Sequence, residues 1–527
     1  MVEIILINFY NMRFRFLLQL SCMVVMAFYG SLLCGQDVNK VIELGATDNH
    51  VMSHLDVLTN RFGGRPIGSD AYDNSVKWVA SQFESWGLDV EVEVAGELAV
   101  GFNRGPWFGR MLGGTDEMTL HFVTPSYTSG TKGIQRGHLL LEPKTQAEFD
   151  RMKGTLKGAW VLISGKSTGY PINISVEADS IRADIINKNK VIEERNAEIL
   201  RNNRKNNAHD TLTALIEEPA LFYKQMCEAG ILGIIQSAPV PLVALYDKNV
   251  VFNPDITIET LPTVPDIKLD ENQYNVIKKM VEERRTFELE FDIRNHFRMG
   301  PVKYCNVIGK IEGSEYPDEY VICSGHLDAY DVATGGVDCG SGVSSVIEAA
   351  RLVALSGAKP KRSMLFIAFA GEEFGLLGAE AWAESHKDML DKISNVFNKD
   401  GGPLAATNVS VPACMYDDFV EICESVSSIN PDIPFKVNKV EPRKKPISTG
   451  GTDASVFAVE GVPTIHLGEA DVFGYNFSYR EIWHTERDLY TKSIPVYQKH
   501  TATVMAVIGL GVANLDHLLS RDGAYEE

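Results

Sequence analysis

The C-terminal half of the chain alternates apolar, strand-like runs with helix-like segments. From residue 306 onward, runs such as EYVICSG and SMLFIAFAG are each followed by a helix-like segment such as GVSSVIEAARLVALSG. Parallel strands joined by helices require right-handed crossovers, which place helices on both faces of the sheet. The pattern therefore predicts an α/β fold with a mostly parallel central sheet flanked by helices. In open sheets of this kind, ligands bind beyond the carboxyl ends of the strands.

Imidazole and carboxylate groups gather at those expected strand ends. They follow the runs EYVICSG, SMLFIAFAG and ISNVFNKD, precede the next helix, or lie in the loop REIWHTERD. Such nitrogen and oxygen donors bind hard or borderline divalent metal ions without a thiolate. A single His-x-Asp or Glu-Glu pair is common in solvated loops, but the joint placement of all these groups at strand ends indicates a site. The set comprises His326, Asp328, Asp338, Glu372, Glu373, Asp400 and His484.

Two blocks precede the alternating half. The first, NHVMSHLDVLTNRFGGRPIGSDAYDNSVKWVASQFESWGLDVEVEV, is typical of a helix, a Gly/Pro turn, a second helix and a strand. The second block, from about Asp116 to Arg298, has short strands broken by loops, with one helix, LFYKQMCEAG, before the strand ILGIIQ. These features predict a separate β-rich domain. Within it, the densely charged residues 187–210 predict a solvated helical hairpin.

Charge and the N-terminal sequence limit the partners and the location. The net charge is −20 and no long basic face is present, which argues against a nucleic-acid partner. Basic Arg13 and Arg15 precede the uncharged run 16–34, the pattern of a secretory signal or an uncleaved membrane anchor. We therefore expect an exported protein that is periplasmic, secreted or tethered to a membrane. Six cysteines outside this run show no Cys-x-x-Cys pair, so we expect buried free thiols: Cys227, Cys305, Cys323, Cys339, Cys414 and Cys423.

Five segments together resemble a known enzyme family. SGHLDAYDVATGGVDCGSG, AFAGEEFGLLGAEAW, FNKDGG, TGGTDASVF and IWHTERD are similar, in this order, to the signature segments of the di-zinc exopeptidases of metallopeptidase family 28. The middle block resembles the protease-associated domain that such enzymes carry as an insertion. The resemblance implies a signal or anchor at 1–35, a catalytic domain in two segments, 36–115 and 299–527, and an inserted domain at 116–298.

The resemblance also implies two zinc ions per chain. One zinc ion would be bound by His326 and Asp400, and the other by Glu373 and His484. Asp338 would bridge the two ions. Two metal ions roughly 3.5–4 Å apart lower the pKa of a shared water, so a hydroxide is available at neutral pH to attack a peptide carbonyl.

Further residues near the metal ligands receive supporting roles from the same resemblance. Glu372 would act as the general base, and Asp328 would orient His326 through its other ring nitrogen. Asp453 would support the site without binding metal. The chain departs from the family at Cys339, where Asn or Asp is common, so a thiol would lie beside the metals.

The expected reaction is hydrolysis of the terminal peptide bond of short peptides or dipeptides. Arg443, Lys444 and Lys445 could bind a substrate carboxylate, but we interpret them as a solvated basic loop, which leaves aminopeptidase and carboxypeptidase action both open. His466, in the apolar run VPTIHLG, is expected to be a core histidine. Two alternatives remain, a glutaminyl cyclase-type acyltransferase with one zinc ion and a non-catalytic, receptor-like member. A homodimer is a candidate assembly.

Overall fold

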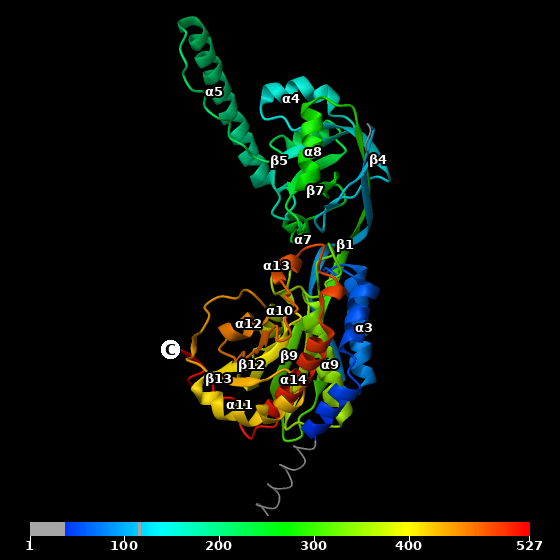
Figure 1. Cartoon of the computed structure of the whole chain (residues 1–527), viewed down its shortest axis with the longest axis vertical. Coiled ribbons are helices and arrows are strands. Elements are labelled where there is room, and N and C mark those ends of the chain that lie inside the picture. The colour runs from blue at the N-terminus through cyan, green and yellow to red at the C-terminus, as the bar shows by residue number, and fades with distance from the viewer. Residues whose placement is uncertain (1–36, 114–116, 527) are drawn as a thin grey trace, which may run out of the picture.

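The computed structural model describes residues 37–113 and 117–526, which form two lobes along one long axis (Figure 1). Two long antiparallel strands, β1 (Asp89–Leu112) and β8 (Glu288–Ile311), run through both lobes and join them. The signal or anchor expected at 1–35 lies outside the described residues. Of the helices that are described, none combines the length and the apolar character that crossing a membrane requires.

The sheet of the lower lobe is built around β9 (Tyr316–His326). This strand pairs in parallel with β10 (Arg362–Phe369) on one side and with β11 (Ile393–Asn398) on the other. Every residue of β10 is buried, as expected for a strand that is covered on both faces. β10 in turn pairs antiparallel with β8. The α/β class with a central sheet between helices is confirmed.

Helices cover both faces of this sheet, the short helices α10 (Leu377–Ser385) and α12 (Ala454–Val459) on one face and three longer helices on the other. α9 (Gly340–Ser356) is buried without interruption from Gly340 to Val353, and it packs against α14 (Pro495–Ala513). A helix that is buried nearly all round lies in the core and not on the surface. α3 (Asp70–Ser85) covers β1 and β8 and buries Val76, Val79, Ala80 and Phe83 against them. The first block of the sequence thus finds its packing partner in these two long strands.

A second, smaller sheet lies beside the central one. Its strands are β12 (Ala405–Val411), β13 (Lys436–Lys439) and β15 (Leu467–Ala470), with β12 in the middle. The apolar run VPTIHLG therefore contributes only its end to a strand, and to this sheet instead of the central one. Two further short helices complete this part of the lobe: α11 (Tyr416–Ile422), which packs against β13, and α13 (Tyr479–Ile482).

The upper lobe extends the sheet from β8. β4 (Gln135–Leu141), β5 (Ala159–Lys166), β6 (Gly233–Ala238) and β7 (Asp266–Asp270) are parallel, and β4 pairs with β8. The predicted helix and strand around residue 230 are confirmed as α6 (Tyr223–Glu228) followed by β6. The lobe holds more helix than the sequence indicated, since it also contains α4 (Gln146–Met152) and α8 (Glu271–Glu282). The proposed domain boundaries stay a prediction.

One helix, α5 (Val176–Asn206), projects away from the upper lobe (Figure 1). The helical hairpin predicted here was wrong: the chain forms a single helix and returns along it in an extended conformation. The side chains of Asn189, Asn196 and Asn203 each exchange two hydrogen bonds with the main chain of residues 210–216. Their spacing of seven residues keeps the three amides on one helix face, so all three can bind the returning segment.

Candidate metal centre

Three neighbouring parallel strands end at one rim of the lower sheet and carry the predicted groups there. β9 ends on His326, the turn after β10 holds Glu372 and Glu373, and Asp400 follows β11. Asp338 lies just before α9, which begins at the same rim. The rule that ligands bind at the carboxyl ends of parallel strands therefore describes where these side chains lie.

Asp338 lies between two histidines. Its Oδ1 is 3.4 Å from His326 Nε2, and its Oδ2 is 3.7 Å from His484 Nε2. His326 Nε2 also lies 3.3 Å from Asp400 Oδ1, and His484 Nε2 lies 3.0 Å from Glu373 Oε2. The centre thus has two halves, each with one imidazole and one carboxylate, and the halves share Asp338. These are the five side chains that the family resemblance assigns to two zinc ions, and that assignment stays a prediction.

The carboxylates of the centre lie close together and are shielded from water. Burial raises the pKa of Glu373 well above its ordinary value, and the charge of Asp338 adds to this. Burial also raises the pKa of Glu372, to about 10, although the charge of His326 opposes it. Glu373 Oε1 is buried without a hydrogen-bond partner in the described structure. A site of this kind fits divalent cations, because they supply the missing positive charge and accept nitrogen and oxygen ligands.

Asp328 supports the centre through two different groups. Its carboxylate is fully buried and accepts the main-chain N–H of Glu372 at 3.1 Å and of Glu373 at 3.3 Å. The main-chain carbonyl of Asp328 lies 3.0 Å from His326 Nδ1, whereas the nearer carboxylate oxygen is 3.6 Å away. The carbonyl therefore accepts the Nδ1 proton, which leaves His326 Nε2 free to face the centre.

Cys339 and Asp453 lie directly behind the rim. Ligand atoms of Cys339, His326 and Asp400 all lie within 4.8 Å of one another. The thiol is fully buried and donates to the carbonyl of Lys399 at 3.3 Å, and burial raises its pKa. Asp453 is also fully buried, and neither of its carboxylate oxygens has a hydrogen-bond partner among the described residues. Burial raises the pKa of Asp453, which favours its neutral form.

Three residues that the sequence did not single out also hold the centre. The Tyr479 hydroxyl donates to Asp338 Oδ2 at 3.2 Å. Asp488 accepts the main-chain N–H of Asp338 at 3.2 Å, and the ring of Tyr330 packs edge-on against His484 with centroids 4.6 Å apart. Tyr479 and Asp488 lie within five residues of His484 in the chain, yet nothing in their spacing distinguishes them from other loop residues.

The upper lobe reaches the centre through its segment 242–247. Val243 forms a β-bridge with Thr485, and the main-chain N–H of Ala244 donates to the carbonyl of His484 at 3.4 Å. His484 itself adopts a left-handed backbone conformation with φ of 57°, which is unfavourable for a residue with a β-carbon. These contacts with the upper lobe help to hold the histidine in that conformation.

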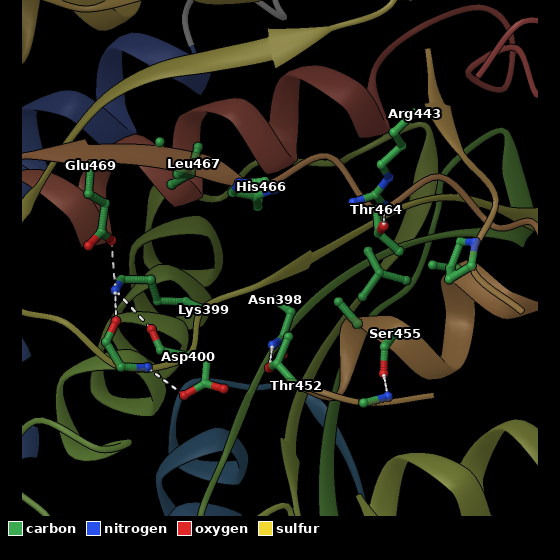
Figure 2. Close-up of a pocket in the computed structure, with 17 residues that line it drawn as sticks. Asn398, Lys399, Asp400, Arg443, Thr452, Ser455, Thr464, His466, Leu467 and Glu469 are labelled. Atoms are coloured by element: carbon green, nitrogen blue, oxygen red, sulfur yellow. Dashed lines mark hydrogen bonds and ion pairs between the residues drawn. The ribbon is translucent and has the colours of Figure 1, made fainter. Parts of the chain in front are cut away.

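A pocket of about 570 Å³ opens beside Asp400 (Figure 2). Asn398, Thr452 and Ser455 contribute to its wall, and the side chain of His466 also lies there. The interpretation of His466 as a core histidine was wrong, because its side chain is exposed to this pocket. The strand β15 begins only at the next residue, so the apolar run around His466 is not buried in a sheet interior.

All six expected free cysteines are free in the described structure, and burial raises the pKa of the Cys323 thiol to about 12. A protonated, buried thiol behaves as a small apolar side chain. Of these six residues, only Cys323, Cys339 and Cys423 are buried, so the expectation of buried thiols is wrong for Cys227 and Cys305, which are half-buried, and for Cys414, which is exposed.

Comparison with known proteins agrees with the geometry. Residues 306–508 match the model of peptidase family M28. Carboxypeptidase Q of Mus musculus is 28% identical over 318 residues, which are 58% of this chain and 63% of the mouse protein. Carboxypeptidase Q of Xenopus laevis is 26% identical over 422 residues, or 77% of this chain and 80% of the frog protein. The chain thus spans less than two thirds of the mouse relative.

A solved structure shares the fold. The crystal structure of a peptidase M28 precursor from Shewanella amazonensis SB2B covers 93% of this chain and 99% of its own, with a TM-score of 0.57 and 18% sequence identity. Residues 306–508, which match the model of peptidase family M28, contain every predicted metal ligand.

Proposed function

We propose that the protein is a zinc exopeptidase that hydrolyses the terminal peptide bond of short peptides or dipeptides. The observation that carries the proposal is the two-halved centre, in which the two oxygens of Asp338 face His326 on one side and His484 on the other. The M28 domain and the relatives named carboxypeptidase Q support the same reaction class.

The side chains of the centre would hold two zinc ions. His326 and Asp400 would bind one ion, Glu373 and His484 would bind the other, and Asp338 would bridge them. When bound, such a pair of ions lowers the pKa of a shared water and polarises the substrate carbonyl. The protein contributes the fixed positions of the ligands, through the carbonyl of Asp328 and the hydroxyl of Tyr479.

Glu372 would move the proton during the reaction. Its carboxylate lies at the rim, 4.0 Å from His326 Nε2, and its side chain is 12% exposed, so it reaches both the centre and an entering substrate. Burial raises its pKa, which makes the carboxylate a stronger proton acceptor, and the positive charge of bound zinc would keep it ionised until it accepts a proton from water and passes it to the leaving amine. Asp328 fixes the turn that carries Glu372 through the main-chain hydrogen bond.

Two rival functions make different predictions. A glutaminyl cyclase-type acyltransferase would bind one zinc ion, whereas two complete halves favour two ions. A receptor-like member would not need a base, whereas here a glutamate lies at the rim beside both halves. We further propose that the chain is exported, on the basis of its N-terminal run, and that a homodimer is a candidate assembly.

The decisive experiment measures bound zinc together with peptide cleavage. The purified chain is assayed with a free dipeptide, an amine-blocked dipeptide and a carboxyl-blocked dipeptide, before and after chelation. We expect two zinc ions per chain and cleavage that chelation abolishes and added zinc restores. The blocked peptides then reveal which terminus the enzyme requires. One zinc ion with cyclisation of N-terminal glutamine, or full zinc loading without any cleavage, would contradict the proposal.

A further inference from the structure

The pocket beside Asp400 has a polar wall of uneven charge (Figure 2). Asp400 marks the end that adjoins the metal centre, and Arg443 lies at the opposite side in the view. Because a substrate bound at the centre must extend along one of its walls, this pocket is positioned to receive a group next to the scissile bond. The charges of the wall therefore bear on which peptides the enzyme accepts.

Most charged groups of this wall are already paired. The Lys399 ammonium lies 2.6 Å from Glu469 Oε1 and donates to the main-chain carbonyls of Asp400, Gly401 and Gly402 at 2.9–3.1 Å. Asp400 itself faces His326. Lysine and carboxylates at this end thus neutralise one another, and they leave little net charge for a substrate to meet.

Arg443 differs from these groups. Its Nη2 donates to Thr464 Oγ1 and, at 3.4 Å, to the Tyr525 hydroxyl, and its guanidinium lies 5.4 Å from the centre of the Tyr525 ring. Thr464 and Tyr525 therefore fix the direction of the side chain without neutralising its charge. Among the described residues, no carboxylate forms an ion pair with Arg443. Its remaining N–H groups are free to bind an anion through the bidentate hydrogen bonds that are typical of arginine.

His466 lies beside Arg443 on the same wall (Figure 2). The atoms of the pocket wall partly shield the His466 ring from water and lower its pKa, and the positive charge of Arg443 lowers it further. The imidazole is therefore neutral at pH 7, and it makes no hydrogen bond to another described residue. A neutral imidazole with a free N–H can donate a second hydrogen bond to an anion that Arg443 holds.

We propose that this pocket binds a carboxylate of the peptide substrate, with Arg443 as the anchoring cation and His466 as a second donor. The inference rests on the proposed peptidase function and names a substrate class for it: peptides with an acidic group next to the scissile bond. That carboxylate is either the side chain of an aspartate or glutamate residue or the free carboxyl terminus of a dipeptide. The interpretation of residues 443–445 as a solvated loop therefore does not extend to Arg443, which alone of the three lines the pocket.

The test compares matched substrates on the zinc-loaded full chain. Glu-Ala is compared with Gln-Ala to test a side-chain carboxylate, and Ala-Ala is compared with its C-terminal amide to test a terminal one. In one of these two pairs, we expect the wild type to cleave the charged peptide with a kcat/KM about 10- to 100-fold higher than that of its neutral counterpart. Arg443→Gln should abolish that ratio mainly through KM and leave cleavage of the neutral member unchanged. Lys444→Gln is the control, since it removes the same charge one residue away and outside the pocket.

A second readout does not depend on catalysis. Binding of glutarate to the chelated, metal-free chain is measured by calorimetry, with Arg443→Gln, Arg443→Lys and Lys444→Gln in parallel. We expect Arg443→Gln to abolish glutarate binding, Arg443→Lys to weaken it, and Lys444→Gln to leave it intact.

The outcomes separate the two proposals. Cleavage of peptides with an unchanged preference in Arg443→Gln would overturn the carboxylate pocket and leave the peptidase function standing. Equal cleavage of charged and neutral members by the wild type would overturn the pocket in the same way. Failure of the zinc-loaded wild type to cleave any peptide would instead contradict the peptidase function, and with it this inference.

Discussion

The α5 arm and the metal centre are both rich in polar side chains, but the centre also buries carboxylate oxygens that have no hydrogen-bond partner among the described residues. The Asn196 amide accepts the main-chain N–H of Thr213 at 2.9 Å and donates to its carbonyl at 2.7 Å. At the centre, Glu373 and Asp453 are buried with oxygens that have no donor in the described structure. Polar groups that satisfy one another stabilise a structure, whereas buried ones left unsatisfied indicate a missing ligand.

The two regions also differ in exposure. Of the residues of α5, only Arg182 and Asn189 are buried, so water can replace a lost hydrogen bond along most of the arm. His326 and Asp338 are nearly inaccessible, with side chains 1% and 6% exposed. A change at the centre therefore cannot be compensated by water, and we expect larger effects there than in the arm.

The largest effect is expected for Glu372→Gln. Glutamine preserves the size of the side chain but cannot accept a proton, so turnover should fall by about 10²- to 10⁴-fold. Zinc content should stay the same, because Glu372 is not one of the proposed ligands. Turnover and bound zinc are measured on the same preparation. Glu384→Gln, on the exposed end of α10, is the control and should keep full activity. A fully active Glu372→Gln variant would rule out Glu372 as the base.

An intermediate effect is expected from metal removal, and its size depends on pH. In the metal-free chain the pKa of Glu372 is about 10, against 4.5 for the ordinary group, because it is buried. Between these values the folded chain binds a proton that the unfolded chain has released. The stability that Glu372 contributes to the metal-free chain is therefore fully present below about pH 4.5, and it is lost as the pH rises towards about 10.

The measurement is Tm from about pH 5 to about pH 9, for chelated and zinc-loaded protein. The chelated chain should lose Tm as the pH rises, relative to the zinc-loaded chain, in which bound cations replace the protons. Parallel curves for the two forms would show that the carboxylates of the centre are not the source of the pH dependence.

The smallest effect on the enzyme is expected for Asn196→Ala. The substitution removes two hydrogen bonds, at about 0.5–1.5 kcal/mol each, and frees the return segment without touching the centre. Hydrogen exchange of the main-chain N–H of Thr213 should accelerate, and turnover should stay the same. Asn202→Ala makes the same change in helix propensity at an exposed position of α5, and it should leave the exchange unaltered. A loss of turnover in Asn196→Ala would show that the arm is coupled to catalysis.

The fold of the catalytic half was largely predictable, and the arm was not. The alternating runs correctly placed β9, β10 and β11 and the helices between them, because the apolar residues of each run show that it is buried. The charged residues 187–210 were misread as two helices, since the local pattern of a helix and of a hairpin is the same when both are solvated. What decided between them was the pairing of three asparagines with the returning chain, a contact that no short-range pattern encodes.

The sequence by itself determined which side chains follow each strand, because residues close in the chain decide where a strand ends. It therefore also determined which rim of the sheet carries the site. Only the tertiary structure decided that Asp338 lies between His326 and His484, and that Arg443 lines a pocket beside Thr464 and Tyr525. Such contacts join residues far apart in the chain. They depend on how whole elements pack, and a local pattern does not contain that information.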